Sequence, residues 1–329
     1  MHRTPRVLPR PLAAERAAAA RRALSACRLC AFRCGVDRTA GPAGACRSDG
    51  TPRLFHEGIE WAGEARLVPT AVVSLSGCNM ACSFCLTGGP SQDGSAGSPL
   101  DADAWAERLA AGGAPLKSVT LLGGEPSIHL DGALEIAARV PRALAFVWKT
   151  TAYASPEGLA LLEGIPDVVL ADFKFGNDDC AARLARVPDY VRVVRDNLRW
   201  AARTSTLIVR HLLMPGHAEC CLRPAAEWLA RELPEVPLSL MTGYLPVFRA
   251  ASDPGMDRTN RSAECRRALE IVAAAGVRTE PWTLVEPPPS RRSADEVWID
   301  REGRICVDSA SPELVAALNR LRPEFELTR

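Results

Sequence analysis

Apolar residues in the middle of the chain follow two alternating patterns. Short continuous runs rich in β-branched residues indicate buried strands, and between them apolar residues recur at the three- and four-residue spacing of amphipathic helices. The expected strands cover residues 71–76, 118–122, 143–148, 167–172, 206–213 and 238–241. The expected helices cover residues 102–111, 130–139, 156–162, 190–203, 223–233 and 263–275. Continuous apolar strands separated by helices predict a parallel sheet covered on both faces.

The same pattern divides the chain into three regions. Residues 1–67 hold an Ala-rich helix and a Gly- and Pro-punctuated, cysteine-rich extension that we expect to wrap around a metal. Residues 68–283 carry six strand–helix units, which fit a partial (β/α)6 TIM-like barrel better than a closed eight-fold one. Residues 284–329 comprise a Pro-rich linker, a small hairpin of residues 297–299 and 304–307, and a short helix. The expected fold class is therefore α/β.

Composition and charge exclude several classes of protein. The 329 residues are 47% hydrophobic and 24% charged, which is ordinary globular composition. A net charge of +1 gives no reason to expect nucleic acid or a membrane surface as a partner. No apolar run approaches the ~20 residues of a membrane span, and the basic stretch at residues 10–24 lacks the apolar core of a signal peptide. We therefore expect a cytoplasmic protein.

Twelve cysteines are the outstanding feature of the composition, and seven of them fall between residues 27 and 85 in two tight groups. Disulfide frameworks rarely space cysteines three and four residues apart, whereas metal sites do. The second group, Cys78, Cys82 and Cys85, directly follows an expected strand with the spacing Cys-x3-Cys-x2-Cys. Three thiolates leave one iron of a cubane cluster open to chelate a cofactor. The alternative is three buried or zinc-bound cysteines.

A Gly-Gly-Glu-Pro segment, beginning with Gly123, Gly124 and Glu125, follows the next expected strand. Two glycines let the backbone approach a ligand closely, and its carbonyl groups can then accept hydrogen bonds from an ammonium group. A plain turn is the alternative. The place of the segment, about 40 residues after the cysteine loop and at the end of a strand, favours ligand binding.

Charged residues also occur at the ends of two later strands. Asp172 and Lys174 share one side of an extended segment because side chains alternate with a two-residue period. Arg210 lies inside an apolar strand, where a buried guanidinium needs an anionic partner. A ligand and an internal ion pair are both possible partners for these side chains.

Together these motifs resemble the radical S-adenosylmethionine (SAM) superfamily, and within it proteins related to pyruvate formate-lyase activating enzyme. The similar branch carries an extra cysteine-rich N-terminus, and the likeness extends over residues 25–250 in consistent order. Its further motifs are Cys-x2-Cys-x3-Cys-Gly-Val at residues 27–36, Arg-His-Leu with Pro-Gly at 210–216 and Met-x-x-Tyr-x-Pro at 241–246. The chain departs from the branch at Leu86, Thr87 and Gly243, on the substrate side, which points to a different substrate with retained SAM chemistry.

The resemblance implies a [4Fe–4S] cluster on Cys78, Cys82 and Cys85 with SAM bound at its open iron. The residues it assigns to SAM or substrate are Phe84, Gly123, Gly124, Glu125, Asp172, Lys174 and Arg210. Phe84, the aromatic residue before the last cysteine, is expected near the adenine.

The first cysteine group offers four thiolates to one further site. Its members are Cys27, Cys30, Cys34 and Cys46. A tetrahedral Zn²⁺ site and a fully ligated auxiliary [4Fe–4S] cluster both fit four cysteines. Both remain open from the sequence.

Most of the remaining cysteines are expected to fill the core. Cys220 and Cys221 follow the Pro-Gly loop of the fifth strand, on the expected active face, and are candidate donors of a hydrogen atom to a substrate radical.

The expected activity is that of a radical SAM enzyme. A low-potential donor such as flavodoxin or ferredoxin reduces the cluster, SAM is cleaved to a 5′-deoxyadenosyl radical, and this radical takes a hydrogen atom from an unreactive carbon. A small-molecule substrate is favoured, for example a sugar-containing natural product undergoing epimerisation. The reasons are the spare cysteines, the departures on the substrate side, and an Ala-, Arg- and Pro-rich composition typical of aerobic GC-rich genomes. The alternatives are an activase for a glycyl radical enzyme and a non-catalytic metal-binding protein on the same fold.

Overall fold

The computed structural model describes residues 10–285, 297–299 and 305–307. Within these residues, an eight-stranded sheet has the order β4-β1-β3-β5-β6-β7-β8-β9. The stretch from β3 to β9 is parallel throughout. Its strands are β3 (Thr70–Leu75), β5 (Ser118–Gly123), β6 (Ala145–Thr150), β7 (Val168–Asp172), β8 (Thr206–Leu212) and β9 (Leu238–Met241). They are the six expected strands, and the sheet ends at β9 without closing on β4, which confirms an α/β fold of the open, partial-barrel kind.

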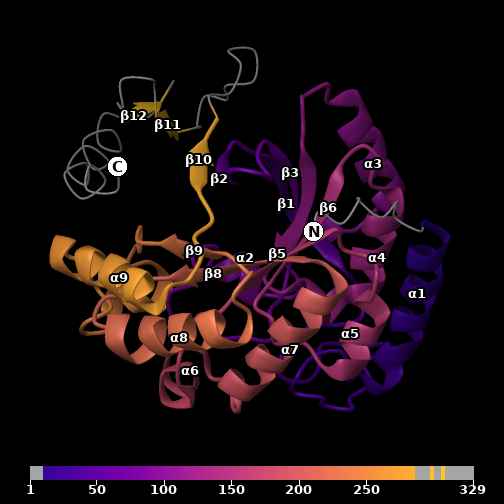
Figure 1. Ribbon diagram of the computed structural model, residues 1–329. Helices are drawn as coiled ribbons and strands as arrows, with labels where there is room; N and C mark the ends of the chain where they lie inside the picture. Colours follow the sequence, from indigo (N-terminus) through magenta and orange to yellow (C-terminus); the bar gives the residue numbers. More distant parts are fainter. Residues whose placement is uncertain (1–9, 286–296, 300–304, 308–329) are drawn as a thin grey trace.

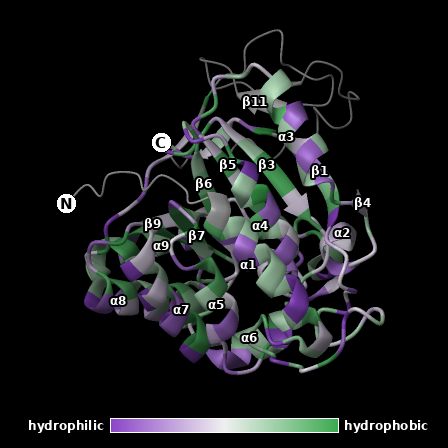
Figure 2. Ribbon diagram, turned by 90° about the vertical axis from the view of Figure 1, so that its right-hand side faces the viewer, coloured by the Kyte–Doolittle hydropathy of each residue, from purple (hydrophilic) through white to green (hydrophobic). Residues whose placement is uncertain are grey.

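The helices that follow the parallel strands lie outside the curved sheet (Figure 1). They are α3 (Ala102–Ala111), α4 (Leu130–Arg139), α5 (Pro156–Leu162), α7 (Tyr190–Thr204), α8 (Arg223–Glu232) and α9 (Ser262–Ala275). In α7 the buried side chains include Tyr190, Val194, Leu198 and Ala201, which recur every three to four residues along one face. Figure 2 shows polar residues on the outer sides of α7 and α8. The expected helices are therefore confirmed, three of them residue for residue.

The N-terminal helix α1 (Arg10–Arg22) adds a further layer over α4. Its buried residues are Ala13, Ala17 and Ala20, whose small side chains let the two helices approach closely. At its end Arg21 donates to Oε1 of Glu135 at 2.9 Å.

Several elements were not expected from the sequence. They are β1 (Arg53–Glu60), β2 (Ala62–Glu64), β4 (Ser98–Pro99), α2 (Gly89–Gln92), α6 (Asp178–Ala185), the π-helix η3 (Ala218–Leu222), β10 (Trp282–Leu284) and the short 3-10 helices η1 (Ala23–Ala26), η2 (Pro126–His129) and η4 (Phe248–Ser252). Strand β1 pairs antiparallel with β3, and so extends the parallel sheet at its N-terminal edge. Strand β10 pairs antiparallel with β2, which joins two segments more than 200 residues apart (Figure 1).

The expected C-terminal hairpin is present as β11 (Val297–Ile299) and β12 (Ile305–Val307), which pair antiparallel. The expected linker and short terminal helix lie outside the described residues. Within the described part of the chain, every helix is too short or too polar to cross a bilayer.

The parallel register gathers the motifs at one edge of the sheet. Leu75, after which the cysteine loop begins, is paired with Gly123 of the Gly-Gly segment. Asp172 is likewise paired with Arg210 on the neighbouring strand. The carboxyl ends of parallel strands form the ligand-binding edge of such folds, so this edge is the place to look for a site.

Candidate functional site

The cysteine loop leaves β3 at its carboxyl end and is held by backbone hydrogen bonds from α6. The amides of Ala81 and Ser83 donate to the carbonyl groups of Ala185 and Leu184, at 2.9 and 2.8 Å. These two carbonyl groups belong to the last turn of α6. A helix that periodicity did not predict therefore fixes the conformation of the loop.

The three thiols of this loop lie close enough to influence one another. Burial raises the pKa of Cys82 to about 12, and the neighbouring Lys174 cation opposes this rise. Burial also raises the pKa of Cys78 well above its ordinary value, and Cys82, Glu125 and Cys85 raise it further. Buried thiols that resist ionisation on their own become thiolates when a metal supplies positive charge. The residues therefore fit an iron–sulfur cluster.

Both glycines of the Gly-Gly segment are required by the chain itself. A Cβ on Gly123, where φ is +144°, would lie 2.0 Å from the carbonyl oxygen of Leu75. A Cβ on Gly124 would lie 1.8 Å from the carbonyl oxygen of Gly77. The segment thus packs directly on the end of β3 and the start of the cysteine loop. The sequence suggested that the two glycines allow a ligand to come close to the backbone, and the structure shows that they allow another part of the chain to do so.

Glu125 is buried, and its carboxylate is taken up by neighbouring donors. Oε1 accepts from the amide of Ser127 at 3.1 Å and the hydroxyl of Thr150 at 2.8 Å. Oε2 accepts from the amide and the hydroxyl of Thr151, both at 2.7 Å. Four hydrogen bonds fill the acceptor sites of a carboxylate, so this side chain ties η2 to the end of β6.

The charged residues at the edge of the sheet form one network. Nζ of Lys174 lies 2.5 Å from Oδ2 of Asp172, and Nε of Arg210 lies 3.4 Å from Oε1 of Glu64 and 3.9 Å from Oδ1 of Asp172. Burial alone would raise the pKa of the Asp172 carboxyl, but Lys174 and Arg210 hold it below its ordinary value. The internal ion pair left open by the sequence is therefore present. Glu64, from the unexpected strand β2, is the partner that sequence reasoning missed.

Lys149 on β6 belongs to the same network. Burial lowers its pKa, as does the nearby Arg210 cation, while three neighbouring carboxylates oppose the change. Asp172 and Lys174 retain side-chain exposures of 23% and 17%, so part of this network is accessible from outside the sheet.

Aromatic side chains surround the cysteine loop. Phe84 is buried, with its ring centroid 6.1 Å from that of Phe175 and 6.4 Å from that of Tyr244. The hydroxyl of Tyr190 accepts from the amide of Lys174 at 2.7 Å. Phe84 therefore joins the loop to the core through ring contacts as well as standing beside the third cysteine.

The four cysteines of the N-terminal group line one small cavity. The chain reverses between Cys27 and Val36, whose backbones are bridged by a 2.8 Å hydrogen bond. Cys30 forms a β-bridge with Ala154, near the end of β6. The sequence-predicted set is thus brought together beside the sheet.

Asn79, inside the cysteine loop, connects the two cysteine groups. Its Oδ1 lies 4.0 Å from Sγ of Cys78, and its side chain also reaches the thiol of Cys30. Its Nδ2 donates to the carbonyl group of Tyr153 at 2.9 Å. One residue therefore contacts both groups.

In the structure, Cys220 and Cys221 belong to a larger cluster of side chains. They lie with Cys180 and His217 in a compact group, with all ligand atoms within 4.8 Å of one another. Cys180 comes from α6 and the other three residues from η3 and the residue before it. Their separation in sequence left no spacing signal that could have joined them.

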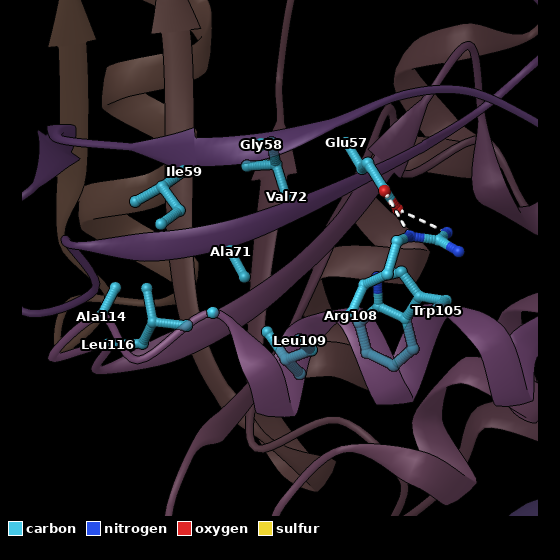
Figure 3. A pocket seen from close by; sticks show the side chains of 11 residues that line it. Glu57, Gly58, Ile59, Ala71, Val72, Trp105, Arg108, Leu109, Ala114 and Leu116 are labelled. Carbon is cyan, nitrogen blue, oxygen red and sulfur yellow. Dashed lines mark hydrogen bonds and ion pairs between the residues drawn. The ribbon is translucent and has the colours of Figure 1, made fainter. Parts of the chain in front are cut away.

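A separate cavity of about 280 Å³ lies between β1, β3 and α3 (Figure 3). Apolar side chains such as Ile59 and Leu109 line it, and Arg108 donates to Glu57 at its rim at 2.7 Å. It borders Ala71 and Val72, in the first half of β3, whereas the cysteine loop follows the other end of that strand. It is therefore distinct from the site described above.

Comparison with known proteins bears on the same region. The family model described as the radical SAM superfamily matches residues 72–229, a range that contains the cysteine triplet, the Gly-Gly segment and Arg210. The uncharacterized protein MJ0674 of Methanocaldococcus jannaschii is 31% identical over 254 residues, which cover 74% of this chain and 73% of that protein.

The solved structures that match part of the chain have low sequence identity to it. Streptococcus suis SuiB bound to its precursor peptide SuiA is 15% identical, with a TM-score of 0.47 over 60% of this chain, and the match spans 43% of SuiB. A domain of pyruvate-formate lyase-activating enzyme from Bacteroides vulgatus is 23% identical, with a TM-score of 0.41 over 49% of this chain and 96% of that domain. On the family match and the M. jannaschii relative, this chain belongs to the radical SAM superfamily.

Proposed function

We propose that this protein is a radical SAM enzyme that holds a [4Fe–4S] cluster on Cys78, Cys82 and Cys85 and abstracts a hydrogen atom from a small polar molecule. The observation that carries the proposal is the placement of three mutually interacting thiols, two buried and one half-buried, beside a partly accessible charged network at the carboxyl edge of the sheet. When bound and reduced, the cluster supplies the electron for cleavage of SAM.

The chain's own residues orient and enclose the reactants. Gly123 and Gly124 let the Gly-Gly segment pack against the cysteine loop, and Glu125 fixes that segment through hydrogen bonds from Thr150 and Thr151. Lys174 sits next to both Cys82 and Asp172, so its cation can stabilise thiolate charge or bind a carboxylate. The aromatic rings around Phe84 help to exclude water from Cys78 and Cys82, which are buried.

The charged network supports a small polar substrate. Asp172 can accept a hydrogen bond from a hydroxyl group, while Lys149 and Lys174 can donate to one. A sugar-like molecule presents several hydroxyl groups close together, which suits donors and acceptors gathered at one strand edge. A protein glycine offers only backbone groups at the reacting position, so the activase alternative makes less use of this network.

Anaerobic reconstitution with iron, sulfide, dithionite and SAM tests the enzyme proposal. We expect 5′-deoxyadenosine from the wild-type chain and from a Cys265→Ala control on α9, and only background from Cys82→Ala. If the wild-type chain formed no more 5′-deoxyadenosine than Cys82→Ala, the result would contradict the enzyme proposal and favour the non-catalytic alternative. With turnover established, a protein glycyl radical signal on a partner supports the activase, whereas solvent deuterium in a small-molecule product supports epimerisation.

We also propose that the N-terminal group, Cys27, Cys30, Cys34 and Cys46, holds a second [4Fe–4S] cluster and not a zinc ion. Among the described residues, ligand atoms converge within 4.8 Å only in the Cys180 group. The four N-terminal sulfurs line one cavity but do not all lie within 4.8 Å of one another. A cubane spreads its ligand sulfurs further apart than a single tetrahedral ion does.

Arg38 adds an electrostatic argument. Its side chain is 1% exposed, and its guanidinium donates to the carbonyl groups of Ser48, Asp49 and Ile128 and approaches Sγ of Cys27 at 3.7 Å. Neutral carbonyl groups do not balance a buried cation, whereas four metal-bound thiolates carry net negative charge around either an iron–sulfur cluster or a zinc ion, so Arg38 supports a metal site here without choosing between the two metals. Asn79, which contacts both Cys78 and Cys30, places the N-terminal cysteine group beside the Cys78, Cys82 and Cys85 loop.

Iron stoichiometry after anaerobic reconstitution distinguishes the two metals. A second cubane predicts about eight irons per chain, falling to about four in Cys30→Ala and also in Cys82→Ala, with Cys265→Ala unchanged. About four irons per wild-type chain, with zinc lost from Cys30→Ala, would contradict the second cluster.

A further inference from the structure

Four side chains meet from the two segments that follow the carboxyl ends of β7 and β8. Cys180 lies in the first turn of α6, and His217, Cys220 and Cys221 lie at the turn that leads into α8. Their four ligand atoms, three sulfurs and Nδ1 of the imidazole, all lie within 4.8 Å of one another. Nothing in the radical SAM chemistry proposed above requires this group.

We infer that Cys180, His217, Cys220 and Cys221 form a structural zinc site of the Cys3His type. A tetrahedral zinc with Zn–S of about 2.3 Å and Zn–N of about 2.0 Å holds its sulfurs about 3.8 Å apart, and sulfur and nitrogen about 3.5 Å apart. The observed Sγ–Sγ distances from Cys220 to Cys180 and to Cys221 are both 3.9 Å. The distances from Nδ1 of His217 to the three sulfurs are 3.3, 3.6 and 3.6 Å.

The local backbone explains how two consecutive cysteines reach one centre. On an α-helix, neighbouring side chains diverge by about 100°. Here the turn is a π-helix, with the amide of Leu222 donating to the carbonyl group of His217, five residues back, at 3.3 Å. Isolated π-helical turns are rare and are frequent at functional sites. The wider turn accommodates Cys220 and Cys221 on the same side.

The second nitrogen of His217 has its own partner. Nε2 lies 3.2 Å from Nη2 of Arg183, a residue of α6. A neutral imidazole that binds zinc through Nδ1 carries its proton on Nε2, so the guanidinium must then turn away. The carboxylate of Asp253 lies 3.8 Å from Nη1 of Arg183 and can form an ion pair with the displaced guanidinium.

A closed set of four protein ligands is typical of structural zinc and not of catalytic zinc, which keeps an open position. The site joins the start of α6 to the start of α8. Because the last turn of α6 holds the cysteine loop through the amides of Ala81 and Ser83, zinc bound here fixes the support of that loop. A zinc-bound thiolate has no S–H bond, so this role also competes with hydrogen donation by Cys220 or Cys221.

Metal analysis of the full-length protein tests the inference independently of SAM chemistry. Protein first reconstituted with iron and sulfide, then loaded with Zn²⁺ and desalted, is expected to retain about one zinc per chain. Cys220→Ser and Cys180→Ser should each lose it. Cys265→Ser and Cys34→Ser, which alter cysteines outside the group, should keep it. Zinc retained by Cys220→Ser, or lost from Cys34→Ser alone, would overturn the assignment.

X-ray absorption at the zinc edge of the wild-type protein provides a measurement that does not depend on a variant folding. Three sulfurs and one nitrogen around zinc are the expected result. Four sulfurs would place the metal among the N-terminal cysteines, and an oxygen-rich shell would indicate adventitious binding. Either result would refute the Cys3His site.

Discussion

The carboxylate of Glu125, which its motif assigns to SAM binding, accepts four hydrogen bonds from the chain itself. The sequence placed it correctly at the carboxyl end of a strand. Its donors Thr150 and Thr151 come from the end of the next strand, about 25 residues later, and no local pattern links them to it. At this scale the sequence identifies which residues gather at the site, but not which of them contact one another.

Replacing Glu125 with Gln should destabilise the fold. The amide retains one carbonyl oxygen and turns its NH2 group toward donors, so at least one buried donor loses its acceptor. We expect the free energy of unfolding to fall by about 2 kcal/mol, measured by denaturant titration. Glu157→Gln, at an exposed ion pair with Arg33, should cost at most about 1 kcal/mol. Equal losses in the two variants would contradict the role assigned to Glu125.

Arg210 illustrates what burial alone can predict. An arginine inside an apolar strand requires an anion, and the structure supplies Glu64 and Asp172. Asp172 could be anticipated from the parallel register of β7 and β8. Glu64 could not, because β2 has only three residues and its pairing with β10 depends on a distant part of the chain.

At the scale of elements, strong periodicity predicted the strands and helices of the barrel. The failures have physical reasons. Strand β1 lies at the edge region of the sheet with several half-exposed and charged positions, so it lacks a continuous apolar run. Helix α6 has only eight residues, and its stability depends on caps and on contacts with η3. The π-helix has no sequence signature of its own.

The N-cap of α6 should control the mobility of the cysteine loop. Oδ1 of Asn177 accepts from the amide of Cys180 at 2.8 Å, and Nδ2 donates to the carbonyl group of Cys220 at 2.8 Å. Asn177→Ala removes both, at a cost of about 1 kcal/mol. We expect the amides of Ala81 and Ser83 to exchange with solvent about fivefold faster, as measured by hydrogen–deuterium exchange.

The N-cap of α3 provides a matched control. Asp101 accepts from the amides of Asp103 and Ala104, and its helix has no part in the cysteine loop. Asp101→Ala should therefore speed exchange in α3 and leave Ala81 and Ser83 unchanged. The same acceleration of these two amides by both variants would mean that α6 does not restrain the loop specifically.

At the scale of the whole molecule, the parallel topology accounts for most of what the sequence could predict about the site. Strand ends gather at one edge, so motifs about 50 residues apart come together. The same rule brings together the two segments that carry the Cys3His group, because they follow β7 and β8, but it does not predict that their side chains converge. The members of this group come from a helix start and a π-helical turn, 37 residues apart between Cys180 and His217, and only the packing of α6 on η3 unites them.

Buried His211 should make the stability of the whole fold depend on pH. Burial lowers its pKa from 6.5 to about 4, and Nδ1 lies 2.6 Å from the carbonyl oxygen of Phe173. As pH falls below 6.5, His211 binds a proton in the unfolded chain, whereas in the folded chain it does not do so until about pH 4. Stability from this group is therefore complete above 6.5 and is lost between 6.5 and 4.

The variant His211→Asn keeps a donor for Phe173 but does not titrate. Between about pH 6 and 5, its free energy of unfolding should vary with pH less steeply than that of the wild type, by roughly 1 kcal/mol per pH unit. Denaturant titrations across this range measure both slopes. Parallel slopes would show that His211 binds a proton as readily in the folded protein as in the unfolded chain.

The pairing of β2 with β10 has a consequence for the order in which the molecule is completed. Glu64, the last residue of β2, pairs with Trp282 near the end of the described chain and accepts from Ser239 at 2.9 Å. During synthesis on the ribosome, the barrel strands emerge well before residue 282. Glu64, one of the two anionic partners of Arg210, is therefore fixed in place only after β10 is made, and a nascent chain halted before β10 holds an unfinished site.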